Sequence, residues 1–260
     1  AKYSSSFCNH CDHIITPSED IHTIIRESEV RKPVSVIPTG IPLQHFQKGD
    51  QGWLRANYAI PQENKILLYV GRLTKEKNLP FLIKTFLLVK EQLPQTTLVL
   101  TAAGPLEDDL KALGRKFGLG SEELVFTGAV PYEKLVNVYH SADLFVFSSL
   151  TETQGLVLTE AMACGLPVVA VRASGVQDMV DDGVDGLLTE LNMEEMAAAI
   201  VRVMEDDALY AQLQHHALQK AEAMSARSMA LQLEDVYLRL NKGRTYRSRR
   251  LLNVSNWFSN

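Results

Sequence analysis

The chain has 260 residues, of which 46% are hydrophobic and 22% are charged, and its formal net charge at pH 7 is −5. This composition is typical of a globular protein with one large or two small domains, and the acidic balance argues against a general nucleic-acid binder. No apolar run reaches the roughly 18–20 residues that a membrane span needs, and the N-terminus lacks the pattern of a signal peptide. Three cysteines are too few for a disulfide framework, so we expect a reducing, cytoplasmic location.

Residues 1–45 are expected to be the end of one Rossmann-like domain, followed by a linker. The segment 11–18 has the pattern of a strand end followed by a helix that begins at Ser18, since serine is favoured at the start of helices. A second short strand is expected at 34–38, and a linker around residues 39–42. This order predicts a β-α-β remnant of a larger domain.

Short apolar runs alternate with helical patterns from residue 65 onward. The apolar runs are nearly continuous and rich in β-branched residues, which is typical of a parallel sheet buried on both faces. The alternation predicts a doubly wound, Rossmann-like α/β domain, which we place at residues 46–230. The expected strands are 65–70, 97–102, 124–127, 143–148, 167–171 and 186–188, and the expected helices are 78–92, 106–118, 132–141, 156–164, 175–181 and 193–205.

The C-terminal part, residues 231–260, is expected to be a helix and a basic tail. Long helices are predicted at 208–240, with one face formed by Leu213, Ala217, Leu218 and Ala221. Residues 241–260 have a local charge of +5 and no acid, so the rest of the chain has −10.

The basic tail ends in two aromatic residues, Trp257 and Phe258. Basic residues with terminal aromatics can dock on an anionic membrane surface. A solvated, disordered tail is the alternative interpretation. The pattern therefore allows peripheral binding to a membrane.

The turn after the first strand of the α/β domain has two cations beside a helix start. It reads Val70-Gly71-Arg72-Leu73-Thr74-Lys75-Glu76-Lys77-Asn78. Gly71 permits close approach of a ligand to the backbone. Arg72 and Lys77 can neutralise a diphosphate leaving group, which otherwise needs a metal. Two solvated surface cations are the alternative for this turn alone.

A second turn, between the strand 143–148 and the helix 156–164, has a pair of glutamates. Glu152 lies in the loop, and Glu160 lies about one turn into the helix. Gly155 lets the backbone approach a ligand, and the first N–H groups of the helix suit an anion such as a pyrophosphate. Two carboxylates that accept hydrogen bonds from hydroxyls, on either side of an anion site, fit a sugar–diphosphate–ribose ligand. A helix with an acidic N-terminus is the alternative interpretation. Both turns are expected at the same edge of the sheet.

These motifs together resemble the retaining GT-B-fold glycosyltransferases of family 4, also called glycosyl transferase group 1, which are glycogen synthase-like in the broad sense. The resemblance covers roughly residues 11–240 and is highly specific. It is carried by Ile37-Pro38-Thr39-Gly40, Gly71-Arg72-Leu73 with Lys77-Asn78, Ala103-Gly104-Pro105, Phe126-Thr127-Gly128, Ala142-Asp143-Leu144-Phe145-Val146, and above all by the segment from Glu152 through Glu160 to Val169.

The resemblance implies a role for each matching residue. In that family the first Glu of the E-x7-E motif contacts hydroxyls of the donor sugar, the second holds the ribose, and the Arg and Lys of the earlier turn hold the diphosphate. Backbone near the Phe-Thr-Gly-x-Val turn contacts the base. The candidate catalytic residues are therefore Arg72, Lys77 and Glu152, and the candidate donor-binding residues are Gly71, Val130, Thr153, Gln154, Gly155, Leu156 and Glu160. The resemblance implies metal-independent chemistry without a cofactor.

One narrower resemblance concerns the acceptor. Most relatives have Phe-Gly where this chain has Gln154-Gly155, and Thr151-Glu152-Thr153-Gln154-Gly155 is similar to the branch that glycosylates diacylglycerol in Gram-positive-type bacteria. The resemblance implies transfer of a hexose, glucose, from UDP-glucose to a lipid in glycolipid biosynthesis. It also implies a protein at the inner face of the membrane.

The chain departs from the family in one respect. The family has two Rossmann-like domains with the acceptor site mainly on the first, and this chain begins near the end of that domain. We therefore expect a fragment, or one half of a two-chain enzyme. A non-catalytic donor-binding subunit and a sugar-nucleotide epimerase of similar fold are the alternatives. Cys8, Cys11 and His13 have metal-like spacing, but no second ligand pair follows, so no metal site is predicted.

Overall fold

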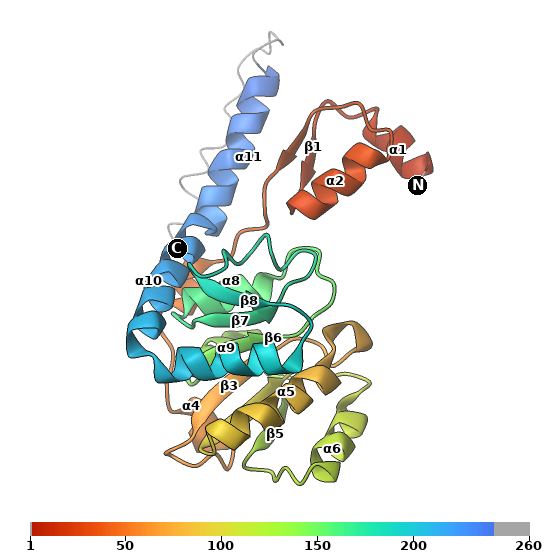
Figure 1. Ribbon diagram of the computed structural model, residues 1–260. Coiled ribbons are helices and arrows are strands. Elements are labelled where there is room, and N and C mark those ends of the chain that lie inside the picture. Colours follow the sequence, from red (N-terminus) through yellow and green to blue (C-terminus); the bar gives the residue numbers. More distant parts are fainter. Residues whose placement is uncertain (1, 242–260) are drawn as a thin grey trace.

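The computed structural model describes residues 2–241 and shows a small N-terminal unit beside a larger domain with a six-stranded sheet (Figure 1). The elements are α1 (Lys2–Cys8), β1 (Ile14–Thr16), α2 (Glu19–Glu27), β2 (Val34–Val36), α3 (Leu43–Phe46), α4 (Trp53–Asn57), β3 (Lys65–Val70), η1 (Lys75–Lys77), α5 (Leu79–Gln92), β4 (Thr96–Thr101), α6 (Glu107–Lys116), β5 (Leu124–Gly128), α7 (Tyr132–His140), β6 (Leu144–Phe147), α8 (Leu156–Ala163), β7 (Val168–Val171), β8 (Gly186–Thr189), α9 (Met193–Glu205), α10 (Asp207–Ala223) and α11 (Ala226–Asn241). The basic tail, residues 242–260, lies outside the described residues, so the predictions about it stay predictions.

The N-terminal unit has the β-α-β order that the sequence predicts. Strands β1 and β2 pair in parallel, with Ile14 opposite Val34. The Ser18 side chain accepts a hydrogen bond from the backbone N–H of Ile21 and so caps the start of α2. A two-stranded parallel sheet is a small fragment of the sheets in which such pairs normally occur, which are covered on both faces.

The larger sheet has the strand order β5-β4-β3-β6-β7-β8, and every neighbouring pair is parallel. The chain enters at β3 in the middle, moves outward through β4 to β5, and then returns to β6 on the other side of β3. Right-handed crossovers that run in opposite directions place their helices on opposite faces of the sheet. The predicted doubly wound, Rossmann-like fold is confirmed, with its topological switch point between β3 and β6.

Helices cover both faces of this sheet. Helix α5, which connects β3 to β4, packs against α9, and α9 also lies on β7 and β8. Helix α8, which connects β6 to β7, packs against α10 and α3. Figure 1 shows α5 and α9 in front of the strands and α8 behind them. The sheet is therefore buried on both sides, which explains why its strands are nearly continuous apolar runs.

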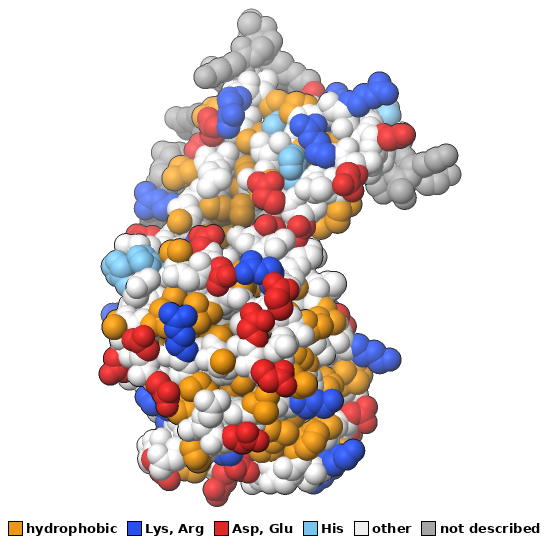
Figure 2. All heavy atoms as spheres, in the orientation of Figure 1, with side chains coloured by type: hydrophobic (Ala, Val, Ile, Leu, Met, Phe, Trp, Pro, Cys, Tyr) orange, Lys and Arg blue, Asp and Glu red, His pale blue; other side chains and the backbone are white. Residues whose placement is uncertain are grey.

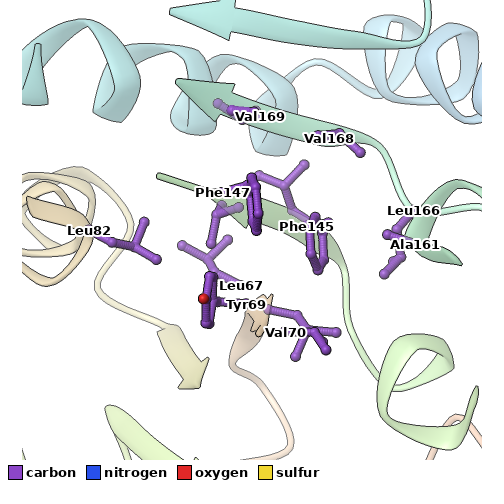
Figure 3. Packing of buried hydrophobic residues seen from close by; sticks show 14 of the residues in the cluster. Leu67, Tyr69, Val70, Leu82, Phe145, Phe147, Ala161, Leu166, Val168 and Val169 are labelled. Carbon is purple, nitrogen blue, oxygen red and sulfur yellow. The ribbon is translucent and has the colours of Figure 1, made fainter. Parts of the chain in front are cut away.

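Aromatic side chains form the part of the core beneath the switch point. Tyr69 on β3 stacks on Phe147 at a ring-centroid distance of 5.8 Å, and Phe147 stacks on Phe145 at 5.9 Å. All three are buried, and Figure 3 shows them with Leu67 of β3 and Val168 of β7 around them. The ends of β3 and β6 therefore rest on a rigid, close-packed support.

Two details of the predicted helices are wrong. Residues 175–181 form turns instead of a helix, because Gly175 has a left-handed backbone (φ 72°) and only one turn follows, with Val180 N–H bonded to the Val176 carbonyl at 3.1 Å. Leu218 is exposed, because it lies about 100° around α10 from the buried Ala217. The predicted boundaries of the three parts of the chain stay predictions.

Several large apolar side chains are exposed on the N-terminal unit and on α11, which project from the same end of the larger domain (Figure 1). They include Phe7 and Ile24 on the unit and Leu231 and Tyr237 on α11. Over the larger domain, Figure 2 shows acidic and basic side chains interspersed on the face in view. Among residues 2–241, no helix has the length and apolar character needed to cross a membrane.

Candidate functional site

The two predicted turns lie side by side, because β3 and β6 are neighbouring parallel strands. The backbone N–H of Leu150 donates to the carbonyl of Glu76 at 2.9 Å. The hydroxyl of Ser148 donates to the carbonyl of Lys77 at 2.8 Å. These bonds join the loop after β6 to the loop after β3 at the carboxyl edge of the sheet, where ligands of such folds bind.

Gly71 and Arg72 begin the first turn directly after β3. Gly71 has φ 151°, and a Cβ atom there would lie 2.6 Å from the hydroxyl oxygen of Tyr69. That hydroxyl donates to the carbonyl of Arg72 at 3.2 Å, so a side chain at position 71 would disturb the bond that fixes the turn. The Arg72 side chain is 78% exposed, with a guanidinium nitrogen 3.8 Å from a Glu76 carboxylate oxygen. This exposure leaves the guanidinium accessible to a ligand.

Lys77 and Glu152 meet between the two turns. The ammonium of Lys77 donates to Oε1 of Glu152, and the side chains are only 13% and 14% exposed. The same ammonium lies 5.8 Å from the ring centroid of Phe147, which offers it a cation–π contact. Shielding from water strengthens this ion pair relative to a surface pair. The structure thus places a cation and an anion from separate turns at one point.

The Glu152 backbone is held by a third loop. Its N–H donates to the carbonyl of Ser174 at 3.0 Å, and Thr151 pairs with Ser174 in an isolated β-bridge. A Cβ atom at Gly175 would lie 2.3 Å from the carbonyl oxygen of Glu152, so only glycine fits there. Sequence reasoning did not single out Gly175, although the Ser174-Gly175 dipeptide is a turn signal.

Thr153 and Gln154, which follow Glu152, differ in burial. Thr153 is exposed. Gln154 is buried, and its carboxamide is bonded to the backbone of Thr39. The predicted contribution of both residues to the donor site stays a prediction.

Gly155 and Leu156 form the start of α8 beside Glu152. Gly155 has a left-handed backbone, with φ 74° and ψ 48°, and no side chain caps the helix. The N–H of Leu158 donates to the carbonyl of Gly155 at 3.0 Å, and the start of the helix concentrates partial positive charge next to Glu152. Glycine at the turn and backbone donors behind it make an arrangement that can hold a phosphate group.

Glu160 lies one turn further along α8 and is hydrogen bonded. The hydroxyl of Tyr139 on α7 donates to its Oε2 at 2.7 Å. Burial raises the pKa of Glu160, while the Tyr139 bond and nearby His45 oppose the shift. The His45 ring stacks on Tyr132 at a centroid distance of 4.6 Å. The sequence identified this carboxylate but not the tyrosine that orients it.

Val130 lies beyond the carboxyl end of β5, at the edge of the sheet. It is partly buried against the core and follows Gly128, whose φ is 67°. Strand β5 is two positions from β3 in the sheet, so Val130 is at the same edge as the two turns but farther from the switch point. Its predicted contact with a base stays a prediction.

A cavity of about 610 Å³ lies elsewhere, along the edge strand β5. Its lining includes Tyr58, Lys111 and Phe126, and none of its lining residues belongs to the two turns. In the part of the chain from residue 2 to residue 241, no group of three or more His, Cys, Asp or Glu side chains is arranged to hold a metal ion. The candidate site is therefore defined by the turns after β3 and β6 and by α8.

Fold and site together define a doubly wound α/β domain with a charged site at its topological switch point. The family model for glycosyl transferases group 1 matches residues 50–221. That span is more than half of the chain and includes both turns, so the chain belongs to the glycosyl transferases group 1 family. The resemblance drawn from the motifs is confirmed.

Two curated relatives illustrate the match. Alpha-monoglucosyldiacylglycerol synthase of Streptococcus pneumoniae is 29% identical over 240 residues, which cover 89% of this chain and 53% of the relative. D-inositol 3-phosphate glycosyltransferase of Saccharomonospora viridis is 33% identical over 213 residues, which cover 78% of this chain and 49% of the relative. The chain spans about half the length of these curated relatives.

Solved structures show the same fold. HepE of Anabaena, in complex with UDP and glucose, superposes with a TM-score of 0.81 at 24% identity, covering 91% of this chain and 66% of that one. Sucrose-phosphate synthase of Thermosynechococcus elongatus gives a TM-score of 0.79 at 27% identity, covering 93% and 61%. These similarities confirm the Rossmann-like fold.

Proposed function

We propose that this chain supplies the donor site of a retaining glycosyltransferase that transfers a hexose, glucose, from a nucleoside diphosphate to an acceptor. The observation that carries the proposal is the shielded pair of Lys77 and Glu152 beside the uncapped start of α8. A cation, backbone donors and a carboxylate converge there, which suits a diphosphate joined to a sugar. HepE, which has the same fold, is described in complex with UDP and glucose.

Each group has one role in the proposed complex. Arg72, Lys77 and the first amides of α8 hold the diphosphate and supply the positive charge that a metal ion provides elsewhere, so no metal is required. Glu152 accepts hydrogen bonds from the sugar, Glu160 accepts them from the ribose, and backbone near Val130 contacts the base. Gly71 and Gly155 allow the ligand to approach the backbone.

The proposed reaction is a front-face displacement. The bond between the anomeric carbon and the diphosphate oxygen breaks, and the electron pair stays with the diphosphate. The acceptor hydroxyl forms its bond to the anomeric carbon on the same face, and its proton passes to the leaving oxygen. Arg72, Lys77 and the α8 amides stabilise the charge that develops on the diphosphate.

We propose a lipid, diacylglycerol, as the acceptor and the inner face of the membrane as the place of action. The Thr151–Gly155 segment supports this, as does the 29% identity to a relative named alpha-monoglucosyldiacylglycerol synthase. The basic tail of residues 242–260 would add attraction to anionic lipids. The acceptor-binding part would be supplied by a further domain or partner chain.

Calorimetric titration of the 260-residue chain with a panel of UDP-, GDP- and ADP-sugars tests the proposal. We expect UDP-glucose to bind equally with and without EDTA, and we expect the purified chain to form little glycoside. Absence of binding to every nucleotide sugar would refute the donor site. Robust transfer would show that this chain alone is sufficient for catalysis. If adding a partner domain restores no transfer, a donor-binding subunit is favoured. Isomerised sugar nucleotides among the products would favour an epimerase.

A further inference from the structure

Gln154 connects the turn that contains Glu152 to a segment 115 residues earlier in the chain. Its Oε1 accepts from the backbone N–H of Thr39 at 2.8 Å, and its Nε2 donates to the carbonyl of Thr39 at 2.8 Å. Both polar groups of the Gln154 carboxamide therefore bond the two backbone polar groups of Thr39. We call this pair of bonds the Gln154–Thr39 clasp.

The chemistry of the clasp requires a carboxamide. The N–H of Thr39 needs an acceptor and its carbonyl needs a donor, so the orientation of the amide is fixed by its partner. A carboxylate lacks the donor, and an aliphatic side chain lacks both groups. Gln154 itself is buried, so its carboxamide needs partners, and the backbone of Thr39 supplies both an acceptor and a donor.

The other side of the Thr39 segment is fixed by the junction of α10 and α11. Ile41 exchanges backbone hydrogen bonds with this junction, accepting from Ala226 at 2.8 Å and donating to Met224 at 3.3 Å. A Cβ atom on Gly40 would lie 2.5 Å from the Cα atom of Ala226. Residues 39–41 are thus held between the Glu152 turn and the start of α11.

A second pair of bonds joins α2 of the N-terminal unit to the loop that supports Glu152. Oδ2 of Asp20 accepts from the N–H of Gly175 at 2.8 Å, and Oδ2 of Asp178 accepts from the N–H of Glu19 at 3.0 Å. Gly175 lies directly against the carbonyl of Glu152. The N-terminal unit therefore bonds to the loop that supports Glu152, and the linker that follows the unit bonds to the Glu152 turn itself.

We propose that Gln154 is a positioning residue: the Gln154–Thr39 clasp holds the turn of residues 152–155 in its donor-binding conformation and couples it to the linker that follows the N-terminal unit. The side chain acts through Glu152 and Gly155 without touching the donor. The expected effect of the clasp on donor affinity rests on the proposed function. The expected effect of the clasp on the conformation of the turn rests only on the hydrogen bonds. The affinity for nucleoside diphosphates, whose phosphates would lie at the turn, should depend on the clasp, and the affinity for monophosphates should depend on it much less.

The test compares Gln154→Met, which keeps the size of the side chain and removes both bonds, with Gln214→Met in the full chain. Gln214 is the matched control, because its Nε2 also donates to a backbone carbonyl, that of Gly165 at 2.8 Å, away from the turn. Hydrogen exchange at the amides of Thr39 and Glu152 measures the clasp and the turn without any ligand. Calorimetry with UDP and UMP measures the effect on binding.

For Gln154→Met we expect faster exchange at both amides and a UDP affinity that falls by roughly tenfold, with little change for UMP. Unchanged exchange at Glu152, or equal losses for UDP and UMP, would overturn the inference. If the parent chain binds no nucleotide, the proposed function fails, and the exchange data still decide whether the clasp orders the turn. Should Gln154→Met not fold, Gln154→Asn keeps the carboxamide but shortens its reach, and the same changes are expected.

Discussion

Replacing Glu160 by glutamine should weaken nucleotide binding and leave the fold at least as stable at neutral pH. The substitution Glu160→Gln keeps the size of the side chain and an oxygen that can accept from Tyr139. A charge-assisted hydrogen bond contributes ~1.5–3 kcal/mol, and a neutral one ~0.5–1.5 kcal/mol. Loss of the charge at a ribose contact should therefore lower UDP affinity about tenfold, and Glu160→Ala should lower it by at least that factor.

The effect on stability follows from the direction of the pKa shift. Burial raises the pKa of Glu160 above its ordinary value of 4.5. Between the unfolded and the folded pKa, the folded state binds more protons than the unfolded state, so the free energy of unfolding falls as pH rises through that window. At pH 7 the ionised Glu160 therefore destabilises the fold, and glutamine removes this effect.

Calorimetry with UDP and GDP, together with denaturant unfolding near pH 4 and pH 7, measures both consequences. The advantage in stability of Glu160→Gln over the parent should shrink toward pH 4. Glu205→Gln, at an exposed glutamate at the end of α9, is the matched control and should change neither quantity. Unchanged UDP and GDP affinities in both Glu160 variants would refute the ribose contact, and a loss of stability at pH 7 would refute the electrostatic reasoning.

Three further predictions concern charges. Arg72→Ala should weaken the binding of a nucleoside diphosphate about tenfold more than that of a monophosphate. The free energy of unfolding should not fall, because the Arg72 side chain is exposed. Loss of diphosphate binding in EDTA would contradict the metal-free proposal. Lys77→Met should lower the free energy of unfolding by up to ~3 kcal/mol because Glu152 loses its shielded counter-charge, and adding Glu152→Gln should recover part of it; strictly additive effects would show that the pair is not coupled. Full-length chain should co-sediment with anionic liposomes at low salt and a 1–240 truncation should not; equal behaviour would remove the tail as a membrane determinant.

The sequence alone was enough to predict the framework of the site. Strand and helix patterns are local, and the predicted strand at 65–70 and the predicted helix at 193–205 match β3 and α9 residue for residue. The glycines and charges of the two turns are also local signals, and parallel strands bring their carboxyl ends to one edge whatever the details of packing. Glu152 and Glu160 could therefore be named as candidate site residues before any contact was known.

Only the tertiary structure decided how those residues are paired. Lys77 and Glu152 are 75 positions apart, and their ion pair depends on β3 and β6 being neighbours in the sheet. Gln154 was singled out for its place in the Glu152 turn, and only the folded chain shows that its carboxamide pairs with Thr39. The raised pKa of Glu160 arises from burial beside Tyr139, which no local pattern encodes. Contacts between distant segments are fixed by packing of the whole domain, because each depends on where other elements place the backbone.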